Sequence, residues 1–275
     1  MPSLSAEEAA RYHREGYVIP DYRLPETTVT RLAATLDRLI AANPGVRPEK
    51  LVSAHIERKP GQGVNADGKN DEGVQGCREF LELAMHPDIL DLVQSVLGPD
   101  IILWGAHVFC KPAHEGYETP WHQDGHYWPM RPLATCTVWV ALEESVLENG
   151  CLKVIPRSHA SHTTHAHLRE DRDDLTLTMR TRDDLFDPAE GVALELASGQ
   201  MSMHDVYLIH GADKNTSGKR RTGIALRYMP GTSVFERNIS LDGTGVSTAF
   251  ATRPLWLLRG QDRTGRNDFK VGHWE

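Results

Sequence analysis

The pattern that most constrains the fold of this chain is a series of strand-like segments that begins near residue 100. Each segment is rich in β-branched and aromatic residues and is separated from the next by turn-forming residues, which is typical of β-strands. The segments are IILWGAHVFCKP from residue 101, ATCTVWVAL from 134, CLKVIP from 151, GVALELASGQMSMHDVYLIHG from 191 and RTGIALRYMP from 221. Their short connections favour antiparallel pairing. The Asn-Gly of residues 149–150 predicts a tight hairpin, because both residues tolerate the positive φ of a type I′ turn.

Helical patterns occupy most of the first hundred residues. Ser5 and Glu8 form a capping box, and the helix that they start is predicted to end at Gly16, before the short strand YVIP. A second helix, closed by the Asn-Pro-Gly of 43–45, is predicted from an apolar stripe of Val29, Leu32, Leu36, Leu39 and Ile40. Helical patterns return over 78–97 and end at Gly98. Residues 57–77 are polar and rich in glycine, which fits a lid over a site and a surface insertion equally well.

Helices followed by antiparallel strands predict an α+β chain that is mainly β, in which a sandwich or jelly roll carries the N-terminal helices. No internal repeat and no sharper boundary interrupts the 275 residues, so we expect one domain. Within it, we expect a mainly helical part over 1–99, a β core over 100–230 and a C-terminal extension over 231–275.

Composition excludes several classes of function. The formal net charge is -8 and Lys and Arg form no dense run, so we expect no nucleic-acid partner. No apolar stretch approaches the roughly 20 residues of a membrane helix, and the N-terminus lacks the apolar core of a signal peptide. The four cysteines show no CxxC spacing and are expected to be reduced thiols of a cytoplasmic protein. Nothing in the sequence indicates an oligomeric state.

The segment TPWHQDGHYWPM, residues 119–130, holds the first candidate metal ligands. On a strand, His122 and Asp124 would point to the same face, about 6–7 Å apart at their Cα atoms, and could share one metal ion. The pair alone is weak evidence, because His-x-Asp also occurs by chance. However, His210 ends an apolar strand further on and Arg221 begins the next one. Two histidines and one carboxylate form the facial triad of non-haem Fe(II) oxygenases, and the planar fork of an arginine suits the far carboxylate of 2-oxoglutarate.

The order of these residues resembles that of the phytanoyl-CoA dioxygenase family of Fe(II)/2-oxoglutarate-dependent oxygenases. The resemblance covers about residues 104–230 and includes FCKP, WHQDGHYWP, TVWVALEESVLENGCLKVIPRSH and HGADKNTSGKRR. The N-terminal helix followed by GYVIP is also similar to the start of family members. The resemblance implies a double-stranded β-helix, the jelly roll of cupin-like proteins, with the N-terminal helices packed on it.

The resemblance also implies the roles of individual residues. His122, Asp124 and His210 would bind Fe(II) and form the catalytic centre, and Arg221 would anchor 2-oxoglutarate, which is a co-substrate together with O2. Lys111 and Trp139 would line the 2-oxoglutarate pocket. Many members have a serine at the position of Ala212, and Thr137 is the candidate to replace its contact with 2-oxoglutarate.

The implied reaction is hydroxylation of a small or medium-sized metabolite with release of succinate and CO2. Desaturation, epimerisation, cyclisation or demethylation by the same iron chemistry are the alternatives within enzymes. A non-catalytic jelly roll that binds a small molecule or a structural metal is the alternative from another class. Such a protein would have no need of Arg221 at its spacing from His210.

Strand alternation gives candidate residues for substrate binding. In ATCTVWVAL, only the face of Thr135, Thr137, Trp139 and Ala141 is mixed enough to line a polar barrel. His107 and Phe109 share a face with Lys111, and Arg227 shares a face with Arg221, so all three are predicted to point inward. The other two candidates are His126 and Trp128, in a segment that fits the rim of the site and an aromatic packing wedge equally well.

The remaining histidines are interpreted more simply. The cluster of His159, His162, His165 and His167 lacks the spacing of a zinc site and is predicted to lie in a solvated loop. His204 could replace His210 as a ligand but lacks the following arginine at the family spacing. His114 is predicted to lie in a loop away from the substrate. A surface or loop position is predicted for His13, His55, His86 and His273.

Overall fold

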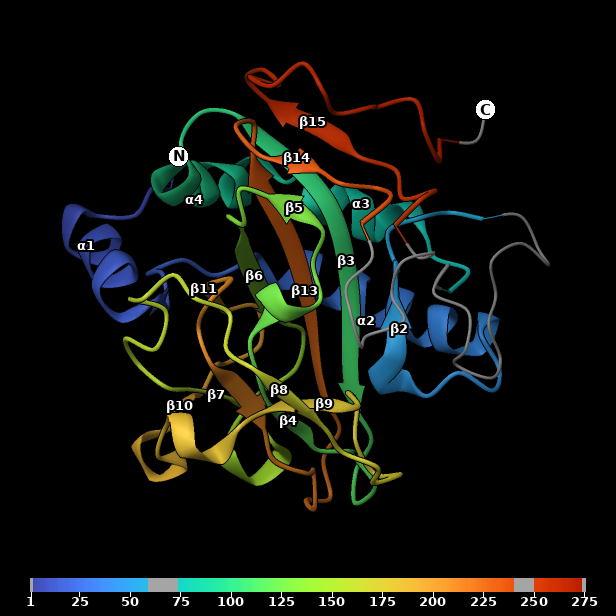
Figure 1. The fold of residues 1–275 in the computed structure, drawn as a ribbon. Coiled ribbons are helices and arrows are strands. Elements are labelled where there is room, and N and C mark those ends of the chain that lie inside the picture. The colour runs from blue at the N-terminus through green and yellow to red at the C-terminus, as the bar shows by residue number, and fades with distance from the viewer. Residues whose placement is uncertain (1, 59–73, 240–249, 274–275) are drawn as a thin grey trace.

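The computed structural model describes residues 2–58, 74–239 and 250–273 (Figure 1). Its helices are α1 (Ala6–Glu15), α2 (Glu26–Ala42), α3 (Arg78–Ala84) and α4 (Pro87–Leu97). Its strands are β1 (Tyr17–Val18), β2 (Leu51–Val52), β3 (Ile101–Lys111), β4 (Thr119–His122), β5 (Met130–Arg131), β6 (Cys136–Ala141), β7 (Leu152–Val154), β8 (His167–Arg169), β9 (Met179–Thr181), β10 (Val192–Leu194), β11 (Met201–Asp205), β12 (His210–Ala212), β13 (Arg221–Pro230), β14 (Val234–Phe235) and β15 (Trp256–Arg259). The chain is therefore mainly β, as predicted.

Local signals set the helix ends as predicted. Ser5 and Glu8 form both hydrogen bonds of the capping box, and Gly16 ends α1 with a φ of 84°. The predicted helical stretch over 78–97 is divided into α3 and α4, because Pro87 lacks an N–H and so favours the start of a new helix. Within the described residues, no helix combines the length and the apolar character needed to cross a bilayer. Most of the predicted lid segment, residues 59–73, lies outside the described residues.

Seven strands form the large antiparallel sheet, in the order β1-β11-β6-β13-β3-β15, with β2 also pairing with β3. One face of this sheet packs against the helices, in the main hydrophobic core (Figure 1). Cys136, Val138 and Val140 of β6 lie in that core, whereas Trp139 and Ala141 pack on the opposite face. The alternation predicted for this strand is therefore confirmed, and the polar residues of the other face are left to surround a site.

The small antiparallel sheet has the order β10-β7-β12-β4. It is formed entirely by segments that follow residue 118, and the chain passes repeatedly between it and the large sheet. The large sheet, in contrast, gains β1, β2 and β15 from outside residues 100–230. The small sheet matters for function because it pairs the strands that end at His122 and begin at His210.

The predicted Asn-Gly hairpin is wrong. Residues 147–149 form a 3-10 turn, and only Gly150 has a positive φ, of 75°. The Asn149 side chain accepts a hydrogen bond from the Val146 N–H and donates one to the Glu144 carbonyl, so it stabilises the turn locally. The two flanking strands, β6 and β7, lie in different sheets, and this segment carries the chain from one to the other.

Candidate metal centre

Two histidines face each other across the small sheet. His122 at the end of β4 is the direct antiparallel partner of His210 at the start of β12, and both side chains are buried. The Nδ1 of His122 lies 2.8 Å from the Pro120 carbonyl, and the Nδ1 of His210 lies 2.9 Å from the Leu208 carbonyl. Because a carbonyl can only accept, each Nδ1 donates and each Nε2 is left free to bind a metal ion.

Asp124 completes the group, but not by the geometry predicted from the sequence. The strand β4 ends at His122, and Asp124 begins a 3-10 turn, so the two residues do not share a strand face. The turn nevertheless brings Asp124 Oδ1 to 3.6 Å from His122 Nε2 and 4.0 Å from His210 Nε2. One ligand atom from each of the three side chains lies within 4.8 Å of the others.

Electrostatics suit a divalent cation at this position. Burial alone would raise the pKa of Asp124, but the neighbouring imidazoles of His122, His204 and His210 hold it well below the usual range. Burial, reinforced by His122, depresses the pKa of His210 well below its ordinary value. A charged carboxylate beside a neutral imidazole is the protonation state that metal binding requires, and the donor set fits Fe(II).

His204 and Thr137 lie beside the second oxygen of Asp124. His204 Nε2 is 3.6 Å from Asp124 Oδ2, and neither ring nitrogen of His204 has a hydrogen-bond partner. Thr137 Oγ1 donates to the same oxygen at 3.4 Å. These two residues are direct partners in β11 and β6. In the sequence, His204 was set aside because it lacks the following arginine. Only the pairing of β11 with β6 places it beside Asp124, and no local motif contains that information.

Gln123, between the two ligands of the motif, was also missed. Its Nε2 donates to the carbonyls of Thr163 and Tyr207, at 3.0 and 2.7 Å, and its Oε1 accepts from the His165 N–H at 2.7 Å. A buried amide needs such partners, and here they connect the metal motif to the segment over 159–167. Gln123 therefore positions this segment against the centre.

The prediction of a solvated loop for the histidine cluster is wrong for two of its members. His159 is buried, and its Nε2 donates to the His13 carbonyl. His167 is half-buried and stacks on His126, with ring centroids 4.0 Å apart. Burial, with a smaller contribution from His126, lowers the pKa of His167 to about 3. His126 therefore packs against His167 and also keeps partial exposure.

Two buried cations lie together where β13 pairs with β3. Arg221 is the direct partner of Lys111, and its guanidinium donates to the Gly150 carbonyl through Nε and Nη2, at 3.1 and 2.6 Å. Lys111 donates to the carbonyls of Ala212 and Asp213. Burial lowers the pKa of Arg221 to about 10, and burial with the nearby Arg221 depresses that of Lys111 strongly. Among the described residues, no carboxylate forms an ion pair with either cation.

Trp139 is placed beside these cations by a glycine. Its ring lies 5.2 Å from the Arg221 guanidinium. A Cβ added at Gly223 would lie 1.8 Å from Cζ2 of Trp139, so no other residue fits there without displacing the ring. The sequence-predicted neighbours Lys111, Trp139 and Arg221 thus lie together in the structure.

The substrate candidates further along the same face also lie together. His107 stacks on Phe109, with centroids 3.8 Å apart, and its Nε2 donates to the Glu49 carbonyl. The Arg227 guanidinium lies 5.6 Å from the Trp104 ring and 4.9 Å from the Trp128 ring. Trp128 is buried in a second hydrophobic cluster, so it packs, while Phe109 and Arg227 keep partial exposure.

His55 corrects another prediction, because it is not at the surface. It is buried, and its ring meets Trp256 of β15 edge-on at 5.0 Å. Neither ring nitrogen has a hydrogen-bond partner. Contacts with residues far away in the sequence bury this histidine, so no local pattern could have predicted its position.

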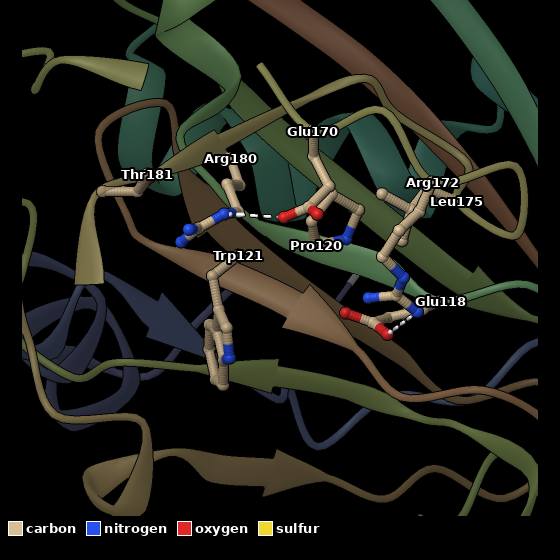
Figure 2. Close-up of a pocket in the computed structure, with 8 residues that line it drawn as sticks. All are labelled: Glu118, Pro120, Trp121, Glu170, Arg172, Leu175, Arg180 and Thr181. Atoms are coloured by element: carbon tan, nitrogen blue, oxygen red, sulfur yellow. Dashed lines mark hydrogen bonds and ion pairs between the residues drawn. The ribbon is translucent and has the colours of Figure 1, made fainter. Parts of the chain in front are cut away.

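A separate hollow lies between β4 and the β8–β9 pair, with a volume of about 210 Å³ (Figure 2). It is lined by Glu118, Pro120, Trp121, Glu170, Arg172, Leu175, Arg180 and Thr181. Figure 2 shows its charges paired: Arg180 with Glu170 at 2.8 Å, and Arg172 with Glu118 at 2.9 Å. Because these charges compensate one another and no triad residue lines the hollow, we do not assign the chemistry to it.

Comparison with known proteins gives a family match over most of the chain. The family model described as Phytanoyl-CoA dioxygenase (PhyH) matches residues 12–223. A Dictyostelium discoideum protein, "Phytanoyl-CoA dioxygenase domain-containing protein 1 homolog", is 28% identical over 56% of this chain and 55% of its own length. The alignment thus spans about half of that relative. The peroxisomal phytanoyl-CoA dioxygenase of Homo sapiens is 24% identical over 94% of this chain and 82% of its own length.

Solved structures share the fold. The non-heme monooxygenase ThoJ, in its apo form, superposes with a TM-score of 0.67 at 23% identity, over 92% of this chain and 84% of that one. The non-heme alpha ketoglutarate dependent epimerase SnoN from nogalamycin biosynthesis superposes with a TM-score of 0.60 at 24% identity, over 82% of this chain and 83% of that one.

Proposed function

The chain belongs to the phytanoyl-CoA dioxygenase family, and from this premise we propose that it hydroxylates a small or medium-sized metabolite as an Fe(II)- and 2-oxoglutarate-dependent dioxygenase. The observation that carries the proposal is the convergence of two free Nε2 atoms and one carboxylate oxygen from His122, His210 and Asp124. This donor set leaves one side of a six-coordinate ion open for co-substrate and O2.

The residues of this chain have separable tasks in the proposed reaction. His122, Asp124 and His210 would hold Fe(II), which supplies O2 activation coupled to the conversion of 2-oxoglutarate into succinate and CO2. Thr137 and His204 would keep the second oxygen of Asp124 turned away from the other two ligands. These contacts orient the carboxylate before any ion is bound.

Arg221 and Lys111 would bind the far carboxylate of 2-oxoglutarate. The two cations are buried and lack a paired carboxylate among the described residues, which is costly unless an anion compensates them. Backbone carbonyls fix the Arg221 fork, and a planar fork can engage a carboxylate through two hydrogen bonds. Trp139, beside the guanidinium, would exclude water from this pair.

The finer architecture belongs to the same proposal. We infer that the two sheets form a double-stranded β-helix within a single domain. The path of the chain supports this, because β3, β6, β11 and β13 of the large sheet alternate with β4, β7 and β12 of the small sheet. The oxygenase centre would then lie between the two sheets, at the strands that carry His122 and His210.

A different outcome of the same oxidation is the second candidate. The fold is similar to that of an epimerase, and desaturation, cyclisation and demethylation begin from the same attack on a substrate C–H bond. The substrate does not follow from the relatives, whose names refer to compounds as different as phytanoyl-CoA and hypophosphite. No feature of the sequence points to a nucleic-acid partner.

The test is anaerobic addition of Fe(II) and then 2-oxoglutarate to the purified protein. A weak visible charge-transfer band is expected in the wild type and absent in Asp124→Ala. Asp173→Ala, which removes an exposed carboxylate elsewhere, is the matched control and should keep the band. A folded wild-type protein that gives no band would contradict the proposal and favour a non-catalytic binding protein.

A further inference from the structure

Arg227 is a cation near the metal centre that the proposed reaction does not use. It lies on β13, and its strand partners are Gly105 in β3 and Thr137 in β6, the residue that donates to Asp124. The rings of Trp104 and Trp128 contact each other, with centroids 4.6 Å apart, and both lie beside its guanidinium. Because Arg227 pairs directly with Thr137, its side chain lies on the face of the large sheet that carries the metal centre, and the residue keeps partial exposure.

The hydrogen-bonding capacity of Arg227 is not satisfied by the protein. Its Nε is buried and has no hydrogen-bond partner, and no ion pair to the guanidinium exists among the described residues. Aromatic rings offset part of the cost of a desolvated cation, but they accept none of its N–H bonds. A buried donor without an acceptor costs free energy unless a ligand supplies one.

Further basic groups surround this guanidinium. Burial and then Arg227 depress the pKa of His107 well below its ordinary value, and Arg253 adds to the effect. Burial and then the positive charges of Arg253, Arg58 and Arg227 do the same to His55. Arg227 therefore adds to the positive potential at both histidines, which favours an anion beside its guanidinium.

Among the described residues, Asp124 is the acid whose charge raises the pKa of Arg227, against the larger lowering by burial. It lies beyond ion-pair distance, and its charge is already required by the metal centre. A divalent ion bound to Asp124 would outweigh that single negative charge. When a divalent ion is bound at the metal centre, the positive charge of Arg227 would therefore be less well compensated than without the ion.

We propose that Arg227, beside the Trp104–Trp128 ring pair, binds an oxyanion of the substrate, so that the substrate class is small organic acids, either carboxylates or phosphate esters. This inference rests on the proposed function, because it assigns the ligand to the side of the centre away from Arg221. The rings would confine the organic part of the molecule, and the guanidinium would fix its charged end relative to the iron.

Model anions test this proposal before the substrate is known. The protein is loaded anaerobically with Fe(II) and saturating 2-oxoglutarate, and dissociation constants are measured by tryptophan fluorescence. The probes are benzoate and phenyl phosphate, with benzamide and phenol as their neutral counterparts. At least one anion is expected to bind about 30-fold more tightly than its counterpart, and Arg227→Met should abolish the difference.

Controls separate the possible results. Arg11→Met removes an exposed arginine that lies 5.4 Å over the Tyr17 ring, and it should keep the preference for anions. Arg227→Lys keeps the charge without the fork and should reduce the preference, which decides the matter if Arg227→Met does not fold. Equal affinity for anions and neutral probes in the wild type, or an unchanged preference in the Arg227 variants, would overturn the proposal.

The two proposals can fail separately. If the charge-transfer band forms but no anion is preferred, the oxygenase assignment stands and the oxyanion site is refuted. If the band does not form, the oxygenase assignment fails, while the fluorescence titration still measures whether Arg227 binds anions. Preference for benzoate or for phenyl phosphate identifies which oxyanion the site takes, and either result supports it.

Discussion

Strand β13 carries two arginines on one face, and the protein surrounds them in different ways. Backbone carbonyls of Gly150 and Phe109 accept hydrogen bonds from Arg221. A contacting pair of aromatic rings lies beside Arg227 and leaves its buried Nε without an acceptor. Carbonyls fix the direction of a guanidinium before an anion arrives, whereas rings restrain its plane and leave its donors available.

The difference matches the two kinds of ligand that such an enzyme needs. A co-substrate that is the same in every turnover gains from a rigid, preorganised partner, as at Arg221. A substrate that differs between relatives is better bound by N–H donors that have no partner within the protein, as at Arg227. The variants that follow either remove a group on which the regions of both Arg221 and Arg227 depend or change one of these regions alone.

The largest effect is expected from removing the carboxylate that both regions depend on. Asp124→Ala should lower kcat by more than about 100-fold, because even changes to residues that only orient metal ligands cost roughly 10- to 100-fold in metal affinity or activity. Turnover measured as succinate formation, with iron content by metal analysis, checks this. Full turnover by this variant would refute the assignment of the triad.

Arg221→Met should affect the binding of 2-oxoglutarate and leave the region of Arg227 unchanged. We expect the KM for 2-oxoglutarate to rise by about 30- to 100-fold, as for loss of a buried charge-assisted pair. The free energy of unfolding should fall by about 1–3 kcal/mol, because the Gly150 and Phe109 carbonyls lose their donor. Steady-state kinetics and urea unfolding measure these two quantities. Arg227→Met is the matched variant, and a similar rise in its KM for 2-oxoglutarate would show that the two arginines do not have separate roles.

A pair of glycines provides a smaller and purely steric comparison. Gly223→Ala would place a Cβ 1.8 Å from the Trp139 ring, and overpacking of this kind costs about 1–3 kcal/mol. Gly105→Ala would meet Arg227 Cδ at 3.8 Å, an ordinary contact, and should be close to neutral. Thermal unfolding of both variants checks this. Equal destabilisation would mean that the two regions are packed equally tightly.

The smallest effect is expected from a substitution that leaves the regions of both arginines unchanged. Ser5→Ala removes the capping box of α1 and should cost about 1 kcal/mol of stability, without altering any kinetic constant. Ser3→Ala, outside the helix, is its control. A change in the KM for 2-oxoglutarate here would show that stability alone shifts the kinetics, and it would weaken the interpretation of the arginine variants.

The sequence was informative wherever side-chain alternation decides the outcome. The faces of β6 follow from a period of two residues. The family resemblance implied that Lys111 and Arg221 share one pocket, and the structure pairs them directly. The sequence was misleading where one side chain can hydrogen-bond to alternative local partners. Asn149 had the composition of a hairpin turn but forms hydrogen bonds within a 3-10 turn instead.

Contacts between distant segments could not be predicted. His204 reaches Asp124 only through the register of β11 with β6, and His55 is buried by residues of the C-terminal segment. The convergence of His122 and Asp124 was expected for the wrong local reason, because the chain turns after Gln123 instead of continuing as a strand. Long-range register determines such contacts, and a single sequence does not contain it.

Gln123 has an evolutionary consequence. Its amide makes every one of its hydrogen bonds to the main chain of segments beyond residue 160, so it recognises the course of the backbone and not particular side chains. Substitutions in the segment over 159–167 that keep its path and the contacts of His159 and His167 should therefore be tolerated by Gln123. Insertions or deletions there would instead shift the proposed iron ligands on either side of Gln123. Diversification of this loop is thus expected to proceed by substitution more readily than by change of length.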